Sequence, residues 1–218
     1  MEIVTITLGS VNCYLLKHEG ANVLIDTGFS HKRKFLESEL EKNGCVEGTL
    51  KLIILTHSDS DHTGNARYLR EKYKERIAMH ANDSIGVQTG KLSLVRQFPN
   101  NMSGFMMKAI NGLVNLNRKD RFTPDLLYAG DTEESAIGAP ISIVALPGHT
   151  LGSIGIVVNE KECACGDFLI NLKKPQKGLG IIDTDEFSRN LEKLRDRGIE
   201  IIYPGHGKSF LLRDFKID

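Results

Sequence analysis

The sequence predicts a mixed chain, of the α+β or α/β class, in which helices cover a sheet core. Three observations predict this class: short apolar runs with strand character, amphipathic helical runs between them, and an acid or histidine soon after several strands. The chain has 218 residues, is 40% hydrophobic and contains 21 Gly and 6 Pro, which suits one domain with a sizeable core. We therefore expect a single domain over residues 1–218.

The chain begins with three strand-like runs at residues 3–8, 12–16 and 23–25. Links as short as those between the runs join antiparallel neighbours. Asp26 follows the third run directly, and Gly28 permits a turn, so the Asp26 carboxylate is expected at the edge of the sheet. Taken alone, Asp26 is also explained as an ordinary turn residue.

The densest cluster of chemically useful side chains follows a strand predicted at residues 50–55. His57, Asp59, Asp61 and His62 fall within six positions. Neighbouring carboxylates at the end of a buried strand repel each other and are costly to desolvate, so a divalent cation is their simplest partner. The cluster has no thiolate, which argues against a closed structural zinc site. A solvated turn with helix-capping aspartates is the alternative explanation.

Helices are predicted at residues 30–43, from about residue 65, and at 184–197, because apolar side chains recur there three and four positions apart. Asp183 is expected to cap the last of these helices, and Gly198 to end it.

Residues 91–125 are predicted to form a helical lid insertion. Met102, Met106, Ile110 and Leu113 fall on one helical stripe, which fits a core-facing helix. Flexible thioether side chains also adapt to varied apolar ligands, which fits a lid over the site. The two explanations are compatible.

Strands predicted to end at residues 25, 55, 146, 165 and 203 are each followed within four residues by Asp or His. This recurrence indicates that the strand ends converge on one shared site. Glycine directly precedes His149, Asp167 and His206, and glycine lets the backbone turn sharply at such points. Either histidine alone would be an ordinary loop residue, but together with the first cluster they are predicted to be metal ligands.

Taken in order, these motifs resemble those of the metallo-β-lactamase-fold metallohydrolases. The resemblance covers nearly the whole chain and implies a four-layer αββα sandwich with two divalent metal ions at one end. It implies that His57, Asp59 and His149 bind the first metal, that Asp61, His62 and His206 bind the second, and that Asp167 bridges them. Asp61 and Asp26 are then the predicted catalytic residues, Asp26 acting as a carboxylate that supports the ligands.

The chain departs from the family pattern at one position. The usual block is His-x-His-x-Asp-His, and Asp59 replaces its second histidine. Zinc is expected first. Because a carboxylate is a harder ligand than imidazole, Asp59 makes iron or manganese plausible alternatives. Flavodiiron proteins of the same fold carry Glu at this position, which leaves a non-haem diiron redox enzyme as an alternative function.

The favoured function is a metal-dependent hydrolase that uses a metal-bound hydroxide on a small ester, lactone, thioester or phosphodiester. A metal-binding module without turnover is a further alternative. Tyr128, Tyr203 and Lys208 are candidates, by position alone, for the acid that protonates the leaving group. Glutathione thioesters are disfavoured, because glyoxalase II-like enzymes of the fold add a helical domain where only 12 residues follow His206 here.

The composition of the chain limits the classes of partner that we expect. Lys+Arg and Asp+Glu are both 28, so no overall field attracts nucleic acid or an anionic membrane. No signal sequence or run of about 18 apolar residues is present, so a cytoplasmic protein with a small-molecule substrate is expected, without nucleic-acid or membrane partners. The four cysteines are spread along the sequence and are expected to be reduced and buried: Cys13, Cys45, Cys163 and Cys165.

Overall fold

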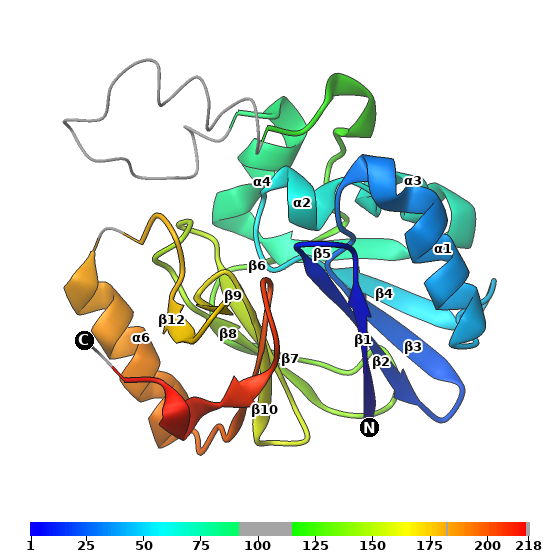
Figure 1. The fold of residues 1–218 in the computed structure, drawn as a ribbon. Coiled ribbons are helices and arrows are strands. Elements are labelled where there is room, and N and C mark those ends of the chain that lie inside the picture. The colour runs from blue at the N-terminus through cyan, green and yellow to red at the C-terminus, as the bar shows by residue number, and fades with distance from the viewer. Residues whose placement is uncertain (92–114, 182, 217–218) are drawn as a thin grey trace.

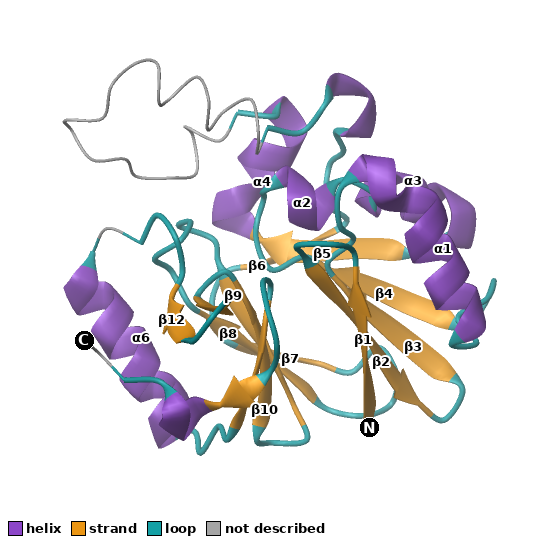
Figure 2. Ribbon diagram, viewed as in Figure 1, coloured by secondary structure: helices purple, strands orange, loops and turns teal. Residues whose placement is uncertain are grey.

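The computed structural model describes residues 1–91, 115–181 and 183–216. In this part of the chain two six-stranded sheets pack face to face, and helices cover the outer face of each (Figures 1 and 2). The predicted four-layer αββα class is therefore confirmed. The methionine stripe of the predicted lid lies within residues 92–114, outside the described residues.

The first sheet has the strand order β1-β2-β3-β4-β5-β6. Its strands are β1 (Glu2–Thr7), β2 (Asn12–His18), β3 (Ala21–Ile25), β4 (Leu50–Ile54), β5 (Arg76–His80) and β6 (Leu126–Tyr128). Short links make β1, β2 and β3 antiparallel, whereas β3 to β6 run parallel. Parallel strands end at the same edge of a sheet, so the residues that follow β3 and β4 emerge together.

The second sheet has the order β14-β13-β10-β9-β8-β7, and β11 and β12 form a small separate pair. Its strands are β7 (Thr132–Glu134), β8 (Ile141–Ala145), β9 (Ile154–Val158), β10 (Glu162–Gly166), β13 (Ile201–Pro204) and β14 (Phe210–Leu211), and the pair is β11 (Leu169–Asn171) with β12 (Pro175–Lys177). β10 and β13 are parallel, so the residues that follow them also emerge at one edge.

The longer helices confirm the predicted helical runs. The helical elements are η1 (Ser30–Lys32), α1 (Arg33–Lys42), α2 (Ser60–Thr63), α3 (Ala66–Tyr73), α4 (Ala81–Thr89), η3 (Arg118–Asp120), α6 (Thr184–Asp196) and η4 (Leu212–Asp214). Asp183 caps α6 as predicted, because its Oδ1 accepts the backbone N–H groups of Asp185 and Glu186. The short helix α4 was not predicted, since among its apolar side chains only that of Val87 is buried.

The apolar side chains form three layers. Leu36 and Leu40 of α1 pack with the outer face of the first sheet, and Leu191 of α6 packs on the second. Between the sheets, Ile25 and Ile54 belong to one buried cluster with residues of β8 and β9. Neighbouring residues of a strand face opposite sides, so each sheet contributes to two layers.

All four cysteines are buried and unpaired, as predicted. Among the described residues, no helix combines the length and apolar character that crossing a membrane requires.

Candidate metal centre

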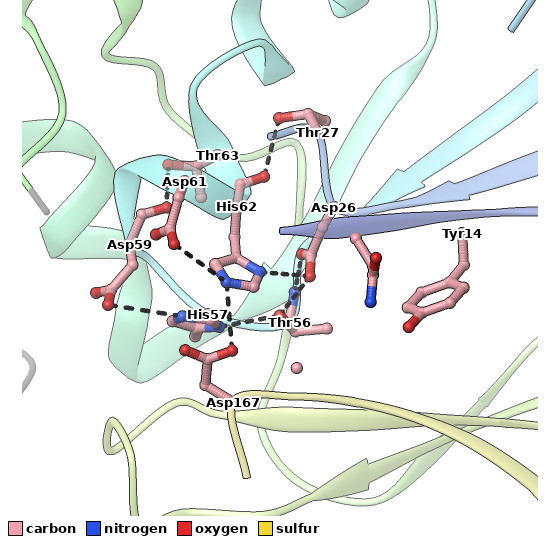
Figure 3. Close-up of polar contacts among 12 residues, drawn as sticks. Tyr14, Asp26, Thr27, Thr56, His57, Asp59, Asp61, His62, Thr63 and Asp167 are labelled. Carbon is pink, nitrogen blue, oxygen red and sulfur yellow. Dashed lines mark hydrogen bonds and ion pairs between the residues drawn. The ribbon is translucent and has the colours of Figure 1, made fainter. Parts of the chain in front are cut away.

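The loops with the predicted site residues meet at one end of the sandwich. Asp26 follows β3 and the cluster from His57 to His62 follows β4, so these residues come from the first sheet. His149, Asp167 and His206 follow β8, β10 and β13 of the second. In Figure 3, Asp167 projects from one side toward the cluster on the other.

The nitrogen and oxygen donors fall into two groups of three. His57, His149 and Asp167 form one group, and Asp61, His62 and His206 form the other. Within each group the donor atoms lie within 4.8 Å of one another, a spacing that suits a shared cation. The structure therefore brings together six of the residues that the sequence predicted as metal ligands.

Asp59 lies beside the first group. Its Oδ2 is 3.3 Å from His149 Nε2 and 3.7 Å from His57 Nε2. Although Asp59 precedes α2, its side chain makes no capping hydrogen bond. The capping explanation therefore does not hold, and the carboxylate faces the two imidazoles.

All four histidines of the site are held through Nδ1. His149 Nδ1 donates to the Leu179 carbonyl at 2.7 Å, and His206 Nδ1 donates to the Ser10 carbonyl at 2.6 Å. His62 Nδ1 lies 2.8 Å from Asp26 Oδ2, and His57 Nδ1 lies 3.0 Å from Thr56 Oγ1. A bonded Nδ1–H fixes the ring and leaves Nε2 as the donor for a metal.

Asp26 lies beside His62 and supports the first-sheet cluster (Figure 3). Its Oδ1 accepts the Thr56 N–H, and its Oδ2 accepts the Thr56 hydroxyl and the His62 ring, each at 2.8 Å. Its φ of 58° is left-handed, a conformation that most non-glycine residues avoid. Because Asp26 reaches the centre only through other residues, it positions ligands.

The charges in the site are mutually dependent. Burial alone would lower the pKa of His206, but the Asp167 and Asp61 carboxylates raise it to about 10. Burial alone would raise the pKa of Asp167, but His62, His206 and His149 hold it well below its ordinary value. The pKa of Asp61 is likewise lowered, because His62 and His206 outweigh its burial. Without a cation, protons on His62 and His206 would offset part of the negative charge of the carboxylates.

The donor atoms fit a metal. His57 Nε2, His62 Nε2 and Asp167 Oδ1 are buried and make no hydrogen bond to any described residue. Buried polar atoms without hydrogen-bond partners are costly, and a cation would satisfy them together. Imidazole nitrogen and carboxylate oxygen are donors that suit zinc, iron or manganese.

Two of the candidate acids are engaged elsewhere. The Tyr203 hydroxyl donates to Glu162 Oε2, at the start of β10, whereas Asp167 follows the end of that strand. The Tyr128 hydroxyl donates to Glu134 Oε2. Burial raises the pKa of Tyr203 to about 12, which makes it a weak acid. Neither hydroxyl is therefore directed to the metal centre.

Sequence reasoning missed two residues that brace the His206 loop. Asn12 Nδ2 donates to the carbonyls of Pro204 and Gly207, and the Tyr14 hydroxyl donates to Pro204 O at 2.6 Å. The only sequence signal was a polar residue at the start of an apolar strand.

A comparison with known families matches residues 6–206 to the metallo-beta-lactamase superfamily. The chain belongs to this superfamily. A probable metallo-hydrolase of Methanocaldococcus jannaschii is 27% identical, and the alignment covers 91% of this chain and 88% of that protein. A hydroxyacylglutathione hydrolase of Haemophilus influenzae is 29% identical, over 95% of this chain and 90% of its own length. The chain is thus a metallohydrolase of this superfamily, as the motifs predicted.

Solved structures agree on the fold. The B3 metallo-beta-lactamase BLEG-1 superimposes with a TM-score of 0.75 at 19% identity, covering 98% of this chain and 95% of that one. A metallo-beta-lactamase family protein from Thermus thermophilus gives a TM-score of 0.68 at 22% identity, covering 97% and 75%.

One relative removes the basis of the length argument against glutathione thioesters. The Haemophilus influenzae relative bears the name hydroxyacylglutathione hydrolase, although 90% of its length aligns with this chain. An added helical domain is therefore no requirement for a protein of that name.

Proposed function

We propose that the chain hydrolyses a small acyl or phosphoryl compound with two divalent metal ions. The observation that carries the proposal is the pair of donor groups, which share one buried site and have their histidines fixed through Nδ1. His57, Asp59 and His149 are proposed to hold the first metal, and Asp61, His62 and His206 the second.

Asp167 is proposed to serve both metals, because its carboxylate faces histidines of both proposed sites. Its Oδ1 lies 3.4 Å from His62 Nε2, and its Oδ2 lies 3.3 Å from His206 Nε2 and 3.8 Å from His149 Nε2. Bound cations would acidify a water molecule and polarise the oxygen of the scissile group. Asp61, whose lowered pKa keeps it ionised, would accept a hydrogen bond from that water and orient it.

Zinc is the first metal proposed, and Asp59 makes iron or manganese the alternatives. The first site would offer two imidazoles and two carboxylates, whereas the usual motif would have an imidazole in place of the Asp59 carboxylate. The added negative charge and the hard oxygen donor both favour harder cations.

Thioesters and esters with an apolar portion are the substrates proposed first. Leu151, Leu172 and Leu179 are 41%, 59% and 66% exposed. The Leu179 carbonyl accepts from His149 Nδ1, the residue before Leu172 donates its N–H to the His206 carbonyl, and Leu151 lies two positions after His149. Leu151 thus belongs to the loop that carries His149, and Leu172 and Leu179 lie on segments that hydrogen-bond to the His206 and His149 loops. An apolar acyl or leaving group is proposed to contact these leucines. Because of the name of the Haemophilus influenzae relative, hydroxyacyl-glutathione thioesters are included among the compounds to be tested.

The test is a panel of thioesters, activated esters, lactones and phosphodiesters. Hydrolysis should vanish after chelation, return with added metal, and fall by roughly 10²-fold or more in Asp61→Ala. Asp214→Ala, at an exposed position, should leave the rate unchanged. Full metal loading with an inert panel would instead indicate a binding module, and oxygen consumption with an electron donor would indicate a redox enzyme.

A further inference from the structure

Asp83 is a fully buried acid that lies outside the motifs of the metal centre. It belongs to the first turn of α4, and its side chain meets two loops that carry predicted ligands. Its Oδ2 accepts the Ser58 N–H at 2.7 Å and the Thr150 hydroxyl at 2.9 Å, and its Oδ1 accepts the Gly152 N–H at 2.8 Å.

The packing around Asp83 leaves little freedom. A Cβ on Gly152 would lie 2.5 Å from Asp83 Oδ1 and 2.7 Å from its backbone nitrogen, so the loop approaches as only glycine permits. Ser153 Oγ accepts the Thr150 N–H at 3.0 Å and lies 2.9 Å from the Thr150 hydroxyl. The carboxylate is thus held from both loops in a buried network.

The two loops come from different sheets. Ser58 lies between His57 and Asp59 in the loop after β4, and Thr150 follows His149 in the loop after β8. One carboxylate therefore joins the backbones on both sides of the first proposed metal site. The ligands of the second site are held by other groups, including Asp26 for His62 and the Ser10 carbonyl for His206.

We propose that Asp83 is a positioning residue for the first metal site alone: it fixes the separation between His149 and the pair His57 and Asp59. The inference rests on the proposed two-metal centre. Loss of the carboxylate releases the Ser58 and Gly152 N–H groups, so the loops move apart and the first site loses affinity. The second site keeps its supports.

The test measures metal affinity in backgrounds that retain one site. In His206→Ala, which disables the second site, Asp83→Asn should weaken Zn²⁺ binding by about 10- to 100-fold, as is usual when a residue that orients ligands is lost. In His149→Ala, which disables the first site, Asp83→Asn should change the affinity by less than about twofold. Competition with a chromophoric chelator measures the Zn²⁺ affinity in both backgrounds, and Mn²⁺ serves as a second probe.

Asp120→Asn is the matched control, since Asp120 is also a buried acid and is paired with Arg33 at 3.4 Å. It should leave the affinity unchanged in both backgrounds. Thr150→Val removes the hydroxyl contacts to Asp83 and Ser153 but keeps both backbone N–H bonds to the Asp83 carboxylate. It supplies a milder variant if Asp83→Asn folds poorly, and it should weaken the first site only. Equal losses in the two backgrounds, or none in His206→Ala, would overturn the inference. Because metal is titrated directly, failure of the hydrolase proposal would be seen separately, in the substrate panel.

Discussion

At the scale of single residues, Asp26 supports two of the proposed ligand histidines with one carboxylate. It accepts directly from His62 Nδ1 and, through the Thr56 hydroxyl, supports His57 Nδ1. Sequence reasoning placed Asp26 at the sheet edge but could not show this relay, because Thr56 has no special sequence signal.

Replacing Asp26 by Asn should weaken metal binding by about 10- to 100-fold, because an amide NH₂ group accepts no hydrogen bond. Either the Thr56 hydroxyl and the His62 ring, or the Thr56 N–H, then lose their acceptor. Equilibrium metal titration provides the measurement. Unchanged affinity would mean that the His62 ring keeps its orientation without the carboxylate.

Replacing Asp59 by His restores the usual motif and should shift metal preference. Imidazole is a softer donor than carboxylate, so Zn²⁺ should gain on Mn²⁺ by roughly tenfold relative to the native chain. Both proteins are expressed in medium with equal concentrations of the two metals, and elemental analysis of each purified protein measures its ratio of Zn to Mn. An unchanged ratio would show that Asp59 does not bind the metal.

At the scale of elements, the ends of five strands predicted the candidate site. The rule worked because parallel neighbours release their following residues at one sheet edge, as β3 with β4 and β10 with β13 do. Asp83 follows the end of β5 by three residues and therefore obeys the same rule. His80 does cap α4, since its Nδ1 accepts the Asn82 N–H.

The short elements escaped prediction for physical reasons. β7, β11 and β12 have three residues each, too few to establish a period of two. The strand pairings and the bracing of the His206 loop by β2 join distant parts of the sequence, which no local pattern encodes.

Glycine at position 205 is expected to be essential to the loop after β13. A Cβ there would lie 2.4 Å from Asp167 Oδ1 and 2.7 Å from His62 Cε1, inside the metal centre. Gly205→Ala should therefore lower metal occupancy at least as strongly as Asp26→Asn. Gly130→Ala, where nothing lies within 4 Å of the added Cβ, should leave occupancy unchanged. Metal content after dialysis compares the two variants.

At the scale of the whole molecule, the proposed metals join the two halves of the sandwich. Each donor group takes residues from loops of both sheets. A metal bound only by the folded chain at 100 times its Kd adds about 2.7 kcal/mol to the free energy of unfolding. Chelation should therefore lower the Tm, and a scanning measurement with and without metal tests this. An unchanged Tm would mean that the unfolded chain binds metal equally well or that the site is not formed.

The acids and histidines of the centre predict opposite responses to pH for metal affinity and for metal-free stability. In the metal-free protein the neighbouring carboxylates raise the pKa of His206 from 6.5 to about 10, and they raise that of His62 as well, in both cases against burial. Metal must displace these protons, so affinity should rise between pH 6.5 and 10, by up to about two logarithmic units per pH unit. A group whose pKa is higher in the folded than in the unfolded chain stabilises the folded chain at pH values below its unfolded pKa. For His206 this stabilisation is lost as the pH rises through about 10.

Unfolding in urea with chelator present should accordingly show falling stability over the same pH interval in which metal titration shows rising affinity. Calorimetry in two buffers of different ionisation enthalpy counts the released protons. His206→Asn removes one titrating group and should reduce both slopes. Affinity that stays constant from pH 7 to 9 would mean that the histidines are already neutral, and that the carboxylates of the centre are balanced by something other than ring protons.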